Sequence, residues 1–141
     1  MDEELAAELA RMAAEDQRIR RPPKGGARTM VRRLDPKTAM DYRRIDAENA
    51  TRLGQILSER GWPGKSLVGE HGAHDAWLIA QHADHQPGVQ RQALELLTAA
   101  VARGEAKPRE FAGECSRRID RMHDGEAEPT ARLAHARVSI A

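Results

Sequence analysis

The sequence predicts an all-α protein that folds as a single-domain bundle of five to six helices. Apolar residues recur at steps of three and four along most of the chain, and we find no convincing alternating strand pattern. Proline and glycine fall where helices would begin and end. The length of 141 residues is that of one ordinary domain. We therefore treat residues 1–141 as one helical domain.

The first predicted helix covers residues 2–21 and ends at Pro22-Pro23, because proline disrupts a helix interior. One stripe of this helix faces inward. Its members are Leu5, Leu9, Met12, Asp16 and Ile19. Residues 22–34 follow as a basic linker between the first and second helices.

Asp35-Pro36 predicts the start of the second helix, since aspartate caps free N–H groups and proline suits the first helical position. This helix runs to about Arg60, and Gly61 suits its C-terminal end. One face collects Tyr42, Asp46, Asn49, Leu53, Ile56 and Leu57. Residues 61–71 are predicted to form a glycine-rich loop.

The third helix is expected over about 72–84 and is apolar on most sides, which predicts a central position. Pro87 opens a fourth helix over about 87–103, and Gly104 closes it. The inward residues of this fourth helix are Val89, Ala93, Leu96, Leu97, Ala100 and Val101.

A fifth helix is expected over about 108–124, between Pro108 and Gly125. Its inward residues are Phe111, Cys115, Ile119 and Met122. The tail, residues 126–141, is poorly defined, although residues 130–138 suit one more short helix.

The amino-acid composition argues against several classes of partner and location. The formal net charge is +1, and two Trp, one Tyr and one Phe provide little for stacking, so we expect no nucleic-acid partner. The basic residues around the linker form either a solvated face or an anion- or partner-binding surface. No apolar run approaches the roughly 20 residues needed to span a bilayer, so no membrane association is expected. Cys115 is the single cysteine, and the acidic N-terminus differs from a signal peptide; both favour the cytoplasm.

Polar residues interrupt the inward faces of three predicted helices. They are Asp16 in the first, Asp46 and Asn49 in the second, and Gln81, His82 and Asp84 at the end of the third. Buried polar groups are costly unless they are paired. They therefore form either a structural network, with Arg20 one turn from Asp16 as its local partner, or a small-molecule pocket inside the bundle.

In the pocket interpretation, His82 is the preferred acid or base, because imidazole transfers protons readily near neutral pH. Asp16 or Asp46 would orient it. The binding groups would be Arg20, Asn49, Gln81, Asp84 and Trp77. Cys115 lies on an apolar stripe, so it is assigned to the core, and no cofactor is expected.

Metal and nucleotide sites are not expected. His71 and His82 would stand about 16 Å apart along one helix, and no zinc motif is present. The segment Gly61-Trp62-Pro63-Gly64-Lys65-Ser66 has two residues where a phosphate loop needs four. Trp62 and Trp77 either pack in the core or form the wall of a pocket.

The segments MAAEDQRIR (12–20), DAENATRLGQIL (46–57), GWPGKSLVG (61–69) and AWLIAQHAD (76–84), with the Gln90 region, resemble a bacterial family of uncharacterised domains that is common in actinobacteria and has no assigned activity. The resemblance covers most of residues 5–122. Its characteristic polar residues correspond to Asp16, Gln17, Arg18, Asp46, Gln81, His82, Asp84 and Asp120. Members often end in Tyr-Gly-Thr-Gln, whereas this chain ends in EPTARLAHARVSIA, which implies a divergent role, such as a specialised biosynthetic enzyme or its partner subunit.

Two functional hypotheses follow. The first is a cytoplasmic enzyme, or the substrate-binding part of one, that acts on a small polar metabolite by cofactor-independent acid-base chemistry. The second is a non-catalytic subunit or interaction module that stabilises or completes a partner protein, with the apolar stripes and the basic linker forming the interface. A homo-oligomer is compatible with both.

Overall fold

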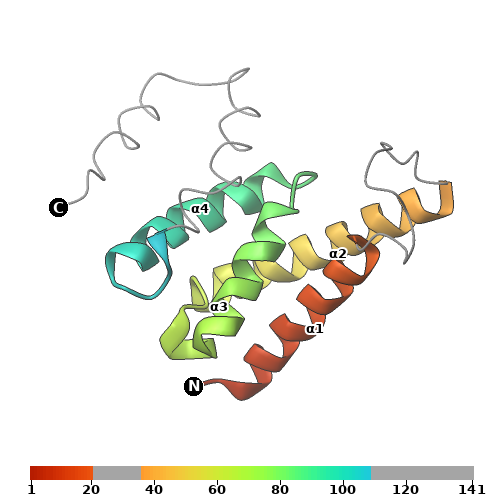
Figure 1. Ribbon diagram of the computed structural model, residues 1–141. Helices are drawn as coiled ribbons and strands as arrows, with labels where there is room; N and C mark the ends of the chain where they lie inside the picture. Colours follow the sequence, from red (N-terminus) through yellow and green to blue (C-terminus); the bar gives the residue numbers. More distant parts are fainter. Residues whose placement is uncertain (21–35, 109–141) are drawn as a thin grey trace, which may run out of the picture.

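The described part of the computed structural model, residues 1–20 and 36–108, consists of four helices and contains no strand (Figure 1). The helices are α1 (Glu3–Arg20), α2 (Pro36–Arg60), α3 (Lys65–Gln81) and α4 (Pro87–Ala102). The predicted all-α class is confirmed for these residues. The linker at 22–34, the tail at 126–141 and the predicted sixth helix lie outside the described residues, as does all but the first residue of the predicted fifth helix.

The bounds of α1, α2 and α4 agree with the sequence prediction to within about two residues. The N–H of Leu5 donates a 3.0 Å hydrogen bond to the side chain of Asp2, which caps α1. Gly61 and Gly104 follow α2 and α4 with φ angles of 73° and 74°. Glycine adopts this left-handed conformation without steric cost, so it ends both helices as predicted.

The predicted loop at 61–71 is wrong over most of its length, because α3 begins at Lys65 rather than at residue 72. Gly69, with φ 77° and ψ 171°, separates two helical segments at a kink. The first segment is anchored by a residue from beyond α4. The N–H and hydroxyl of Ser66 donate to Glu105 at 2.9 and 2.8 Å. This long-range cap stabilises a turn that the local glycine content disfavours.

Helices α1 and α3 run side by side in the same direction, and α2 runs antiparallel to α1 (Figure 1). The N–H of Asp2 bonds to the carbonyl of Leu67 at one end of the α1–α3 pair, and Asp16 meets His82 at the other. Arg60 of α2 reaches back to Asp2 at 2.9 Å. Helix α3 contacts the other three helices, so its predicted central position is confirmed.

The core lies where the four helices meet. Its largest fully buried apolar side chains include Leu9, Leu53, Ile56, Ile79 and Leu97. The predicted inward faces are right in large part, but Met12 and Ile19 are only half-buried, whereas Ala13 is buried. None of the helices described in residues 1–20 and 36–108 has the length and apolar character needed to cross a membrane.

Candidate functional site

A buried carboxylate lies where the C-terminal ends of α1 and α3 meet the first half of α2. Asp16 follows Leu5, Leu9 and Ala13 along the buried stripe of α1, and only 1% of its surface is exposed. Helical spacing therefore carries this charged side chain into the interior, as the sequence predicted. A carboxylate in this position is tolerated only when hydrogen-bond donors surround it.

Three side chains surround Asp16. The Nδ1 atom of His82 lies 2.8 Å from Oδ1 and 3.0 Å from Oδ2 of Asp16. Arg20 donates to Oδ1 at 2.6 Å, and Gln17 donates to Oδ2 at 2.8 Å. The predicted Asp16–Arg20 pair, one helical turn apart, is present. We refer to Asp16, Arg20, Asp46 and His82 as the Asp16 cluster.

Arg20 joins both acidic residues of the cluster. Its Nη2 atom donates to Oδ1 and Oδ2 of Asp46 at 2.7 and 2.9 Å, while Nη1 holds Asp16. The guanidinium also lies over the ring of Tyr42, 5.3 Å from the ring centre. The planar guanidinium of arginine can donate to two carboxylates at once. These hydrogen bonds fix α1 against α2.

The imidazole of His82 is oriented by its contact with Asp16. A carboxylate accepts hydrogen bonds, so in the neutral ring the proton belongs on Nδ1, and Nε2 carries the lone pair. Nε2 has no hydrogen-bond partner among residues 1–20 and 36–108. The side chain is 18% exposed.

The other predicted site residues have their described contacts elsewhere. Asn49 donates to the carbonyl of Met12 at 3.3 Å and thereby ties α2 to α1. Asp84 accepts a 3.2 Å hydrogen bond from Gln90. The ring of Trp77 packs against that of His74, with 5.1 Å between centroids. Gln81 is buried at the end of α3, and its carbonyl accepts a 3.5 Å hydrogen bond from Gln90.

The predicted inward face of the fourth helix left out Gln90, which is 1% exposed in α4. Its amide donates to the carbonyl of Ala80 at 3.3 Å as well as to Asp84, so it fastens the end of α3 to α4. Gln90, Ala93, Leu94 and Leu97 follow helical spacing, and this stripe was the available signal.

A surface hollow of about 590 Å³ lies between α1 and α3, and none of the four residues of the Asp16 cluster lines it. It is lined by Ala10, Ala13, Ala14, Gln17, Arg18, His74, Asp75 and Leu78. Gln17 connects the hollow to the cluster, because it lines the hollow and its side-chain amide donates to Asp16. Leu78 lies one turn before His82. A small molecule in this hollow would therefore lie next to the cluster.

Burial raises the pKa of the Asp75 carboxyl above its ordinary value of 3.8, and the nearby His74 and His71 oppose this effect only in part. The folded chain thus holds the Asp75 proton more tightly than the unfolded chain. The stability associated with this group is complete below about pH 3.8 and is lost as pH rises through the raised pKa.

We accordingly expect Asp75→Asn to be more stable than wild type at about pH 7 and equal to it at about pH 3.5. Glu8→Gln is the control of opposite sign, because a hydrogen bond from Arg52 lowers the pKa of Glu8. This control should be less stable than wild type at neutral pH. Urea unfolding at stepped pH measures both differences, and a destabilised Asp75→Asn at neutral pH would contradict the assignment.

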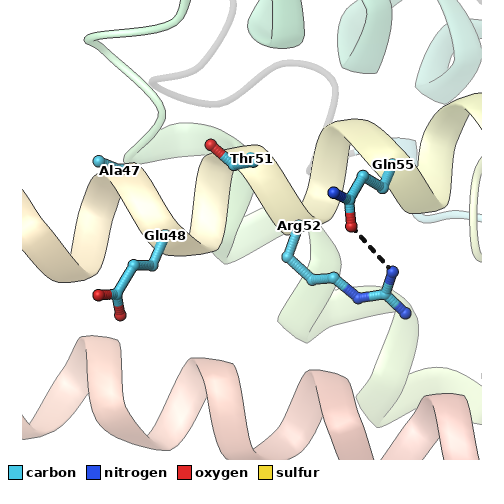
Figure 2. Close-up of a pocket in the computed structure, with 5 residues that line it drawn as sticks. All are labelled: Ala47, Glu48, Thr51, Arg52 and Gln55. Carbon is cyan, nitrogen blue, oxygen red and sulfur yellow. Dashed lines mark hydrogen bonds between the residues drawn. The ribbon is translucent and has the colours of Figure 1, made fainter.

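A second hollow, of about 390 Å³, lies along the outside of α2 (Figure 2). Its lining residues are Ala47, Glu48, Thr51, Arg52 and Gln55. Figure 2 shows Arg52 extending along the helix to Gln55, and this hydrogen bond measures 3.1 Å. Arg52 also pairs with Glu8 of α1. A single helix forms this wall and its one arginine is already engaged, so we assign it no chemistry.

The described residues include no group of three or more His, Cys, Asp or Glu side chains placed to hold a metal ion.

The described residues define an all-α protein with a buried carboxylate–imidazole pair. The chain belongs to a family of unknown function, DUF6624, whose model matches residues 3–131. No curated protein and no solved structure matches the chain.

Proposed function

We propose that this protein catalyses proton transfer on a small polar metabolite, with His82 as the acid or base and without a cofactor. The observation that carries the proposal is the contact of Asp16 with Nδ1 of His82, which leaves Nε2 on a partly exposed ring. A positioned acid or base of this kind contributes roughly 10² to 10⁴ to a reaction rate.

Within this proposal Asp16 keeps the imidazole in one tautomer and stabilises the cation that forms when Nε2 takes up a proton. Arg20 and Asp46 are positioning residues. Arg20 was expected to bind substrate, but both of its terminal nitrogens already donate to carboxylates. Its role is therefore to fix Asp16, and substrate binding is assigned to the hollow between α1 and α3.

The proposed setting is the bacterial cytoplasm and specialised metabolism. A single cysteine and the resemblance to actinobacterial domains support it.

Incubation with a bacterial extract of polar metabolites, followed by untargeted mass spectrometry, tests the proposal. The wild-type chain should consume at least one compound, and His82→Asn should consume it at least about 100-fold more slowly. His85→Asn is the matched control, because His85 is an exposed histidine three positions further along the chain. This control should retain the wild-type rate.

Equal rates in His82→Asn and wild type would overturn the role of His82. A metabolite pool left unchanged by the wild-type chain would overturn the enzymatic proposal. If the chain then co-purified in fixed ratio with another protein, the result would favour a non-catalytic partner subunit instead.

A further inference from the structure

We infer that the hollow between α1 and α3 binds the ammonium group of a small amine at Asp75. The inference rests on the proposed function and specifies its substrate class: a small molecule with a cationic amine at one end and the reacting group at the other. The evidence for it is the set of residues that line the hollow and the hydrogen bonds and ion pairs that those residues already make.

The carboxyl group of Asp75, which has no described partner, is the first observation. Asp75 is half-buried in the wall of the hollow, and it makes no hydrogen bond or ion pair within residues 1–20 and 36–108. The carboxylates of Asp16 and Asp46, by contrast, are each held by Arg20. A partly desolvated carboxylate without a donor is a position that a cation stabilises.

The other charged groups of the hollow do not reverse this preference. Arg18 lines it, but its guanidinium donates to both oxygens of Glu15 at 2.6 and 2.8 Å. That pair is close to neutral as a unit. Burial raises the pKa of Asp75 by more than the nearby His74 and His71 lower it, so the net shift is upward. An anionic ligand would therefore find no uncommitted arginine here, whereas an ammonium would meet Asp75.

Part of the lining is small and apolar. Ala10, Ala13 and Ala14 lie on the α1 side beside Gln17 and Arg18, and Leu78 lies on the α3 side with Asp75. Methyl groups leave room for the carbon chain of an amine and offer it apolar contact. A volume of about 590 Å³ lies within the range of small-molecule sites.

The positions of Asp75 and His82 along the chain set the length of the ligand. At about 1.5 Å per residue, they lie about 10 Å apart along the axis of α3. They also fall on nearly the same side of the helix, because seven residues make about two turns. A ligand with its ammonium on Asp75 would thus present a group about 10 Å away to His82.

Titration of the full chain with n-pentylamine, followed by backbone amide NMR, tests the site. We expect saturable shifts at Ala13, Ala14 and Leu78, and an affinity about tenfold lower in Asp75→Asn. Glu48→Gln is the matched control, because it removes an exposed carboxylate from the hollow on α2. Pentanol and pentanoate, which share the carbon chain but lack the cation, should bind more weakly than the amine.

The outcomes separate this inference from the proposed function. Pentylamine binding that is equal in wild type and Asp75→Asn, or an absence of shifts at the hollow, would overturn the amine site. Amine binding that depends on Asp75, with no turnover of any metabolite, would support the site and overturn the acid-base function. Turnover that depends on His82 but not on Asp75 would support the acid-base function and overturn the amine site.

Discussion

Asp16→Ala is expected to lower the free energy of unfolding by about 3 kcal/mol, a large share of the stability of a small domain. The substitution removes the common acceptor of three side chains, and it leaves His82 and Gln17 without the partner that positions them. Arg20 retains Asp46, which keeps the cost below that of a fully orphaned charge. Urea denaturation gives the change directly.

Asp46→Ala is the matched control for this stability prediction. Asp46 is also paired with Arg20, but it is more exposed than Asp16 and Arg20 is its one described partner. We expect a loss of about 1 kcal/mol. If Asp16→Ala cost no more than Asp46→Ala, Asp16 would not be the centre of the cluster.

His82→Gly is expected to reduce turnover of the metabolite identified in the extract by about 10²- to 10⁴-fold, and added imidazole should restore part of the rate. Glycine removes the ring and leaves space in which a free imidazole can bind Asp16 through one nitrogen. Rescue by imidazole would show that the reaction requires an imidazole ring at this position.

The dependence of rescued turnover on Asp16 is the accompanying control. In the double variant His82→Gly/Asp16→Asn, imidazole should rescue less, because the carboxylate that orients the ring is gone. Circular dichroism must show that both variants are folded. Equal rescue in the single and double variants would contradict the orienting role of Asp16.

Much of the arrangement of the Asp16 cluster can be predicted from local sequence patterns. Asp16 interrupts an apolar stripe, and Arg20 lies four residues further on, so their pairing follows from helical geometry. His82 was expected to point inward because it ends an apolar run. Sequence alone left both Asp16 and Asp46 as possible partners of His82. The choice depends on how α3 is rotated against α1, and this rotation is set by packing across the whole core.

The features that sequence reasoning missed depend on long-range contacts. The start of α3 is stabilised by Glu105, 39 residues beyond Ser66, and no local signal indicates such a cap. Glycines at 61, 64 and 69 favoured a loop, yet Gly69 forms a kink between two helical segments. Gly72 is buried against Val68, where a β-carbon would come within 2.8 Å of its neighbour.

We propose that Asp16 holds Nδ1 of His82 and leaves Nε2 available for proton transfer. Long-range proton–nitrogen NMR of the histidine rings measures this most directly, with His82→Asn used for assignment. We expect the neutral ring of His82 to carry its proton on Nδ1, and Asp16→Asn to disturb that tautomer. A neutral ring protonated on Nε2 and unaffected by Asp16→Asn would contradict the account.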